Sequence, residues 1–198
     1  MPTSSQSRSI SEWASIIEFL GSKRVARLVS ALALLSANLA WAGTSTLVAQ
    51  TSVNSNCSVA AAAVAFGTYD PITTNAPPAS GGVNLNATGS ITITCVKGTA
   101  PTIGLSLGAH ASGSIRRMLS GSTDFLTYEL YQPPSTAANT ACAFPGTTVW
   151  GTAGVNLFSP GAAPAKTARV YNICGTAAAG QDPAIGTYAD AVVATVTF

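Results

Sequence analysis

TYADAVVATVTF, residues 187–198, is the stretch that decides the fold of this chain. Its apolar side chains recur at alternate positions, which is the spacing that places them on one face of a β-strand. The stretch therefore predicts a strand that buries this face in a core. The residues of the predicted face are Tyr188, Val192, Ala194, Val196 and Phe198.

Upstream of this strand, Gly, Pro, Ser, Thr and Asn interrupt the chain about every ten residues, which is typical of a sandwich or barrel. After Gly43 no window shows a helical period with caps. The sequence predicts an all-β domain with about six strands and two long loops, residues 70–82 and 133–164, the second holding a short strand at 147–150. The predicted main strands are residues 57–66, 90–97, 102–107, 125–131, 166–173 and 187–198.

Alternation also predicts which side chains of the other strands face the core. The residues expected inward are Ile91, Ile93 and Cys95; Ile103, Leu105 and Leu107; Leu126, Tyr128 and Leu130; and Ala168, Val170 and Asn172.

The N-terminal residues have the three parts of an export signal. Lys23, Arg24 and Arg27 form a basic cluster, an apolar run at 28–39 follows, and Ala40-Trp41-Ala42 provides small residues at a cleavage site. A membrane anchor is the alternative, but the run is about half of the ~20 residues that span a bilayer. We expect residues 1–42 to be a signal peptide that is removed, with export to the periplasm and the cell surface.

Charge and cysteine content fit an exported single domain. The formal net charge of +2 belongs to the leader, because residues 43–198 carry five basic and five acidic side chains. No basic field remains to attract nucleic acid or anionic lipid. An even number of cysteines in an exported chain predicts two disulfides, for which three connectivities exist, and we favour pairing neighbours along the chain. The pairs are then Cys57 with Cys95 and Cys142 with Cys174.

The two ends of residues 43–198 suggest how the chain assembles. An immunoglobulin-like sandwich has a further strand after the one at 187–198, and the sequence supplies no residues for it. Such a sandwich exposes core side chains and an unpaired strand edge. Residues 46–53 are β-prone and uncharged, and they precede the first cysteine. We expect the segment 43–56 to be a donor strand that fills the gap in a neighbouring subunit, although it could equally fold back or remain a free tail. Its expected inward residues are Leu47, Ala49, Thr51 and Val53.

Several motifs along residues 54–198 resemble one known family. They are Cys57-Ser-Val, Phe66-Gly-Thr-Tyr-Asp-Pro, Gly89-Ser-Ile-Thr-Ile-Thr-Cys, Arg117-Met, Leu126-Thr-Tyr-Glu-Leu-Tyr, Trp150-Gly, and Gly186-Thr-Tyr-Ala-Asp with the ending Thr195-Val-Thr-Phe. In this order they resemble the spore coat protein U family, the pilin-type domain of archaic chaperone–usher pili. Cys142, Cys174 and the Tyr171-Asn-Ile-Cys-Gly stretch depart from that pattern.

The resemblance implies an incomplete immunoglobulin-like sandwich that lacks its final strand, with a domain at 57–198. It implies a periplasmic chaperone, an outer-membrane usher, and polymerisation with neighbouring subunits by donor-strand exchange. It also implies a Cys57–Cys95 disulfide. The expected function is a structural pilin or minor pilin of a bacterial surface fibre that supports adhesion or biofilm formation. The alternative is a coat protein or a single-domain adhesin that binds a surface ligand.

The sequence gives little support to an enzyme, a metal site or a cofactor. His110 is the sole histidine and lies in a Gly-rich turn, so a nucleophile has few possible bases. The sequence has no C-x-x-C motif, so it does not predict a zinc site. The five carboxylates of residues 43–198 are scattered, and Asp70-Pro and Asp182-Pro are typical of turns. We expect Arg116-Arg117 to be a solvated edge or a loop support, and Trp150 to be a core residue.

Overall fold

The computed structural model describes residues 47–121 and 123–198 of the chain. It divides into two units, Met1–Gln50 and Thr51–Phe198. The predicted signal peptide, residues 1–42, lies outside the described residues. In the first unit, residues 47–50 are exposed and belong to no helix or strand.

The second unit is built from strands, with two single-turn 3-10 helices, Pro78–Ser80 and Gly154–Asn156, in its loops. Long turn-rich segments separate the strands, as the Gly and Pro spacing predicts. No helix among the described residues is long and apolar enough to cross a membrane. The strands are β1 (Cys57–Ala62), β2 (Leu85–Cys95), β3 (Thr102–Leu105), β4 (Arg116–Ser120), β5 (Asp124–Tyr131), β6 (Arg169–Ala177) and β7 (Ala194–Thr197).

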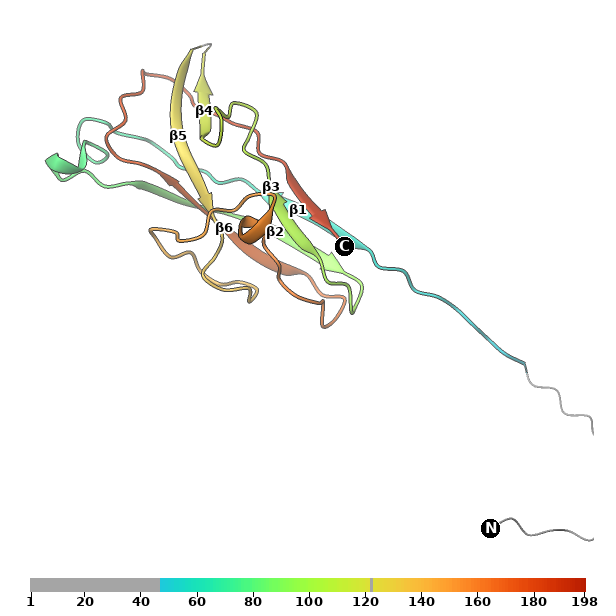
Figure 1. The fold of residues 1–198 in the computed structure, drawn as a ribbon. Coiled ribbons are helices and arrows are strands. Elements are labelled where there is room, and N and C mark those ends of the chain that lie inside the picture. Colours follow the sequence, from blue (N-terminus) through green and yellow to red (C-terminus); the bar gives the residue numbers. More distant parts are fainter. Residues whose placement is uncertain (1–46, 122) are drawn as a thin grey trace, which may run out of the picture. The chain divides into compact units, whose positions relative to one another are not determined.

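The strands form two antiparallel sheets (Figure 1). The larger sheet has the order β1-β2-β6-β5-β4, and the smaller one pairs β3 with β7. Residues of both sheets share one hydrophobic core, for example Ile91 of β2 and Ile103 of β3, each fully buried. Two sheets that enclose one core make a sandwich. The predicted all-β class is therefore confirmed.

The predicted alternation is right for two strands, partly right for a third and wrong for a fourth. On β3, Ile103 and Leu105 are buried as expected, but Leu107 is exposed, because the strand ends at Leu105. The inward residues of β2 and β5 are buried as expected. On β6, the expected face with Ala168, Val170 and Asn172 is wrong: Arg169, Tyr171 and Ile173 are the buried residues. The guanidinium and the phenol made these positions look polar, but the fold buries both side chains, including the Nε and Nη2 atoms of Arg169, which have no hydrogen-bond partner among the described residues.

Several strand bounds also differ from those expected. β4 was not predicted, because Arg116-Arg117 looked like a solvated edge. The strand expected at 187–198 is shorter, with regular pairing only in β7. In place of the strand expected at 147–150 there is a single bridge between Val149 and Tyr131. The loops expected at 70–82 and 133–164 contain no strand.

Trp150 anchors the loop 132–168 to the core, as expected for a core residue. Its side chain is fully buried, and its indole N–H donates to the carbonyl of Ile103 at 2.9 Å. The rings of Trp150 and Phe158 lie 4.9 Å apart, and those of Phe158 and Tyr171 lie 5.2 Å apart. These contacts cover the sandwich on the β3 side with aromatic side chains.

The two disulfides join the pairs favoured from the sequence. Cys57–Cys95 connects the start of β1 to the end of β2, and Cys142–Cys174 ties the loop 132–168 to β6. Each closes a loop of more than thirty residues, 38 and 32 apart in sequence. By the chain-entropy account each stabilises the fold by about 4 kcal/mol.

Arg116 is a buried support of the loops around it. Its side chain is fully buried and pairs with the carboxylate of Glu129. It also donates to the carbonyls of Ser106 at 2.9 Å and Trp150 at 2.7 Å. A buried guanidinium that is both paired and hydrogen-bonded avoids the cost of an isolated charge. The expectation of a loop support is confirmed for Arg116.

Candidate functional site

The outer edge of β1 is open. β1 pairs only with β2 among the described strands. Val96 N–H donates to the Asn56 carbonyl at 2.9 Å, so residues 56, 58, 60 and 62 turn their backbone groups toward β2. Cys57, Val59 and Ala61 turn theirs away from it. The Cα atoms of Cys57 and Cys95 lie 4.1 Å apart, which fits a narrow pair without backbone bonds.

The last strand has an open edge of the same kind. Ile103 exchanges both backbone bonds with Phe158, so Val196, which lies opposite Ile103, is not bonded to it. Ala189 exchanges bonds with Leu119. Odd-numbered residues of this segment therefore bond to β3, β4 and their connecting loop, and even-numbered residues face the other way. Within the described residues, the backbone groups at 190 and 192 have no backbone partner.

On both edges, the residues with free backbone groups also point their side chains toward the core. Val59 lies opposite the fully buried Ile93, yet 49% of Val59 is exposed. Tyr188, Val192 and Ala194 are only half-buried against the core. Apolar groups on the inward face stay accessible because none of the described strands lies between the two edges.

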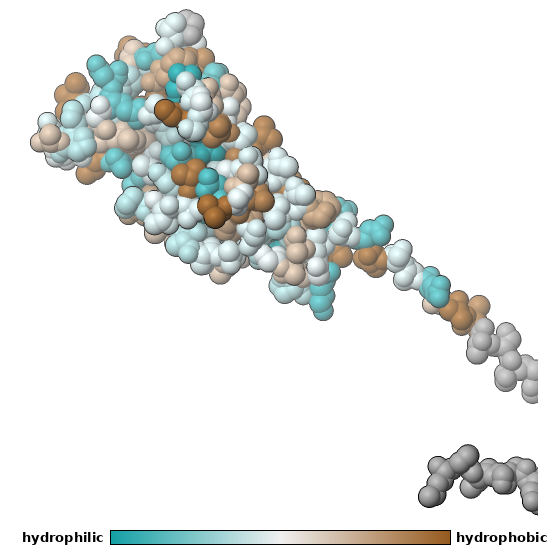
Figure 2. Space-filling view, viewed as in Figure 1, coloured by the Kyte–Doolittle hydropathy of each residue, from teal (hydrophilic) through white to brown (hydrophobic). Residues whose placement is uncertain are grey.

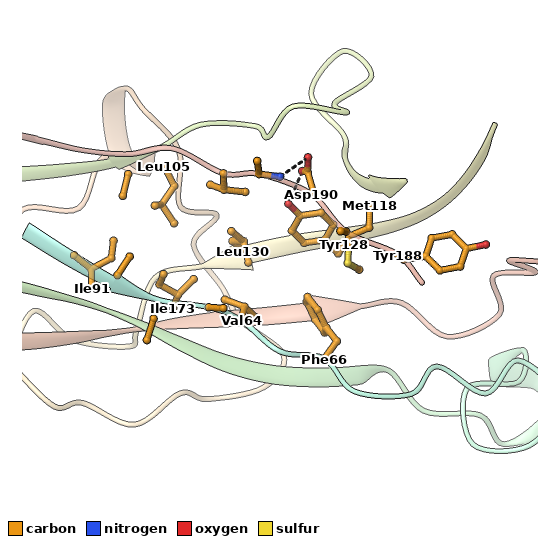
Figure 3. Close-up of a pocket in the computed structure, with 17 residues that line it drawn as sticks. Val64, Phe66, Ile91, Leu105, Met118, Tyr128, Leu130, Ile173, Tyr188 and Asp190 are labelled. Carbon is orange, nitrogen blue, oxygen red and sulfur yellow. Dashed lines mark hydrogen bonds between the residues drawn. The ribbon is translucent and has the colours of Figure 1, made fainter. Parts of the chain in front are cut away.

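The space between the edges is an apolar groove made of two cavities. The first has a volume of about 430 Å³, and Ile91, Leu105, Leu130 and Ile173 are part of its lining (Figure 3). The second, of about 630 Å³, continues toward residues 183–187 and 67–71. Figure 3 shows the last strand on one side of the groove and the segment with Val64 and Phe66 on the other.

The two cavities share a waist, which we define as Val64, Phe66, Met118 and Tyr188. Two glycines let this waist form. A Cβ at Gly175 would lie 2.6 Å from Val64 and 2.8 Å from Phe66, so only glycine leaves room for both side chains. Gly89 leaves similar room for Val64. Phe66 also packs edge-on against Tyr128, with ring centroids 5.9 Å apart.

A hydrogen bond between Tyr188 and Asp124 supports the groove from the outside. The Tyr188 hydroxyl donates to the carboxylate of Asp124, and this bond lowers the pKa of Asp124. Burial, and then this hydrogen bond, raises the pKa of Tyr188 to about 12. At neutral pH the phenol is therefore uncharged and donates, and the carboxylate is ionised and accepts. The bond fixes the ring of Tyr188 at the waist.

Of the residues expected on the inward face of the last strand, some line the groove and others lie outside it. Tyr188, Val192 and Ala194 line the first cavity, and Val196 packs against the core. Phe198 is half-exposed and is not part of the groove lining.

The four residues expected to be donated are exposed and outside any strand. Leu47 is 95% exposed and Val53 is 77% exposed, and Ala49 and Thr51 are exposed as well. Figure 2 shows apolar and hydrophilic groups alternating along the segment that precedes β1.

The remaining polar candidates have structural partners. Asp70 accepts from the backbone of Ile72 and Thr73, as expected for a turn residue. Arg117 stacks on the ring of Phe125, with 3.9 Å from its guanidinium carbon to the ring centroid. Between residues 47 and 198, with residue 122 left aside, no three His, Cys, Asp or Glu side chains cluster as metal ligands would.

Two features of the site, the glycines that let the waist form and the burial of Asp190 in the groove wall, were not predicted from the sequence. The waist depends on Gly89 and Gly175, which lie on separate strands, and only the β2–β6 pairing brings them together. Asp190 lines the first cavity as a buried carboxylate. A polar residue at an inward position of an apolar strand was the available signal for Asp190.

These observations define a class of protein: a two-sheet antiparallel sandwich that lacks one strand and keeps both neighbouring edges open. Residues 43–195 match the Spore Coat Protein U domain family, and the chain belongs to this family. It is similar to Protein U of Myxococcus xanthus, with 35% identity over 188 residues, 88% of this chain and 96% of that protein.

A solved structure is also similar. It is a chain from the chaperone–tip adhesion subunit pre-assembly complex of the archaic chaperone–usher Csu pili of Acinetobacter baumannii. The TM-score is 0.49 at 24% sequence identity, and the match covers 74% of this chain. The match spans 40% of the length of the solved chain.

Proposed function

We propose that this protein is a structural subunit of a bacterial surface fibre, and that each subunit donates residues 47–53 to the groove of the next. The observation that carries the proposal is the groove itself. Both of its edges present backbone groups without a backbone partner, and at Ala61, Asp190 and Val192 the same residues also line the groove. An added β-strand satisfies both kinds of group at once.

Along the donated segment, bulky side chains flank smaller ones, and this order suits two cavities joined by a narrow waist. Leu47 and Val53 are six residues apart, or about 20 Å in an extended strand. Placed in register, they put one bulky side chain in each cavity, with the smaller Ala49 and Thr51 passing the waist. A shift of one residue would instead bring Gln50 to the apolar waist, so the alternation favours the first register.

The energy available from this insertion is several kcal/mol. Burying a Leu or Val side chain contributes about 1.5–3 kcal/mol relative to exposure. Each backbone hydrogen bond formed with an edge adds about 1 kcal/mol net. Because a donor at one end and an acceptor groove on the body form a head-to-tail interface, repetition produces an open filament.

Export and assembly factors complete the proposal. Residues 1–42 act as the signal peptide, residues 43–56 as the donor segment, and residues 57–198 as the acceptor domain. The partners are neighbouring subunits, a periplasmic chaperone that shields the groove before assembly, and an outer-membrane usher. The fibre stands at the cell surface and supports adhesion or biofilm formation.

Deleting residues 47–53 tests the proposal. The deletion variant is expected to be exported, to form both disulfides and to bind the chaperone, but to end chains because it cannot donate. Co-expression with the cognate chaperone and usher, followed by electron microscopy, measures fibre length. The matched control replaces the outward-facing Gln50 with Ser, which should leave fibres unchanged. Fibres of normal length from the deletion variant would refute the donor assignment.

A coat protein is the second candidate, because the family is described by a spore coat protein. The genes beside this one separate the two candidates. Neighbouring chaperone and usher genes support a fibre, whereas their absence supports a coat.

A further inference from the structure

Asp190 is a buried carboxylate in the wall of the groove. Its side chain is only 2% exposed, although its neighbours Ala189 and Ala191 are exposed. It lies between Tyr188 and Val192 on the segment that borders the first cavity (Figure 3). A buried carboxylate is costly unless hydrogen bonds compensate it, so its partners show what it holds.

The partners of Asp190 come from three separate parts of the chain. Oδ1 accepts from the backbone N–H groups of Ala109 at 2.9 Å and His110 at 3.1 Å, and His110 Nδ1 lies 3.1 Å from the same oxygen. Oδ2 accepts from the Tyr128 hydroxyl of β5 at 2.7 Å. The N–H of Ala191, next in the chain, donates at 2.9 Å.

The loop that Asp190 binds is fitted to it. Gly108 has a φ of +91°, and a Cβ at this position would overlap the Asp190 carboxylate. The same loop continues the contact along the last strand. Ala109 N–H donates to the carbonyl of Ala191 at 3.1 Å, and Ser106 N–H donates to the carbonyl of Val193 at 2.9 Å. Regular pairing with β3 begins only at Ala194, so these bonds hold the segment ahead of β7.

We propose that Asp190 is the positioning residue for strand addition: its carboxylate fixes residues 190–193 so that the open edge receives the donated strand in register. The inference rests on the proposed function of the groove. The bonds at 191 and 193 turn the backbone groups of residues 190 and 192 toward the groove. Tyr128 links Asp190 to the larger sheet, which also holds β1. Without the carboxylate, the edge at residues 190–193 would no longer be held at a fixed distance from β1.

Ionisation of the carboxyl is consistent with this role. Burial opposes it, but the hydrogen bonds from Tyr128, Ala191 and His110 outweigh burial and lower the pKa of Asp190. The other charged groups nearby are Arg116 and Glu129, which act on Tyr128, and Arg117, which donates to the His110 carbonyl. Because the pKa of Asp190 is lowered in the fold, its hydrogen bonds stabilise the fold fully above the ordinary carboxyl pKa. This stabilisation is lost as the pH falls through the lowered pKa of the folded protein.

The test measures binding of a fluorescent peptide with the sequence of residues 45–56 to the chain from residue 43, by anisotropy. Asp190→Asn should weaken binding at least tenfold at pH 7. Asp182→Asn, which changes an exposed carboxylate outside the groove, should leave binding unchanged. In a His110→Gln background, binding should weaken as the pH falls through the lowered pKa of Asp190, and Asp190→Asn should reduce this dependence to the part that Asp124 contributes through Tyr188.

A second variant covers the case in which Asp190→Asn fails to fold. Tyr128→Phe removes one hydrogen bond to Asp190 and keeps the ring that packs on Phe66, and it should weaken binding about threefold. Equal binding by wild type, Asp190→Asn and Tyr128→Phe would overturn the role of Asp190 and leave the proposed function standing. No binding of the peptide by the wild-type chain would instead refute the groove as an acceptor.

Discussion

The two sides of this sandwich have the same alternation of side chains, but one side is covered by a loop and the other is left open. On one side, the loop 132–168 lies over the sheets, places Trp150 and Phe158 in the core, and is fixed by Cys142–Cys174. On the other side, between β1 and the last strand, inward residues such as Val59 remain half-exposed. The closed side shows what a completed core looks like in this chain, and the open side shows what is missing.

This difference separates two sources of stability. Side chains on the closed side stabilise the single chain, because their partners belong to the same chain. Side chains on the open side are only partly covered by the described residues, so they are expected to contribute mainly once a strand is added. Substitutions on the two sides should therefore affect different measurements.

The largest expected effect on the single chain is on the closed side. Trp150→Ala removes a fully buried indole and its hydrogen bond to Ile103. It should lower the free energy of unfolding by about 3–5 kcal/mol. Urea denaturation of the chain from residue 43, with both disulfides intact, measures this loss. A loss below 1 kcal/mol would show that the closed side is not the stable core described here.

The smallest expected effect on the single chain is on the open side. Val59→Ala shortens a side chain that is already half-exposed, and it should lower the free energy of unfolding by less than about 1 kcal/mol. In assembled fibres the same change should cost more, because the added strand buries Val59. Comparing denaturant midpoints of free chains and fibres checks this. An equal loss in both states would contradict the partition between the two sides.

The sequence predicted the fold well where one side chain in two is plainly apolar. Ile91, Ile93, Leu126 and Leu130 are buried as the alternation required. It failed at β6, because the fold buries Arg169 and Tyr171 together with their polar groups, which an alternation of apolar residues does not predict.

The candidate site was harder to predict, because it depends on contacts between distant strands. The edge residues of the last strand were visible as a pattern, and three of them line the groove. The waist was not visible, since Gly89 and Gly175 acquire meaning only when β2 and β6 pair and Val64 and Phe66 fill the space above them. Likewise, Asp190 could not be assigned a partner before the fold brought the 108–110 loop to it.

Residue-resolved amide hydrogen exchange, with and without the peptide of residues 45–56, tests the addition of a strand most directly. We expect the amides of Val59, Ala61, Asp190 and Val192 to become protected when the peptide binds, because their N–H groups gain partners. The amide of Ala189 already bonds to Leu119 and should change little. Peptide binding that leaves the amides of both edges exchanging as in the free chain would contradict strand addition.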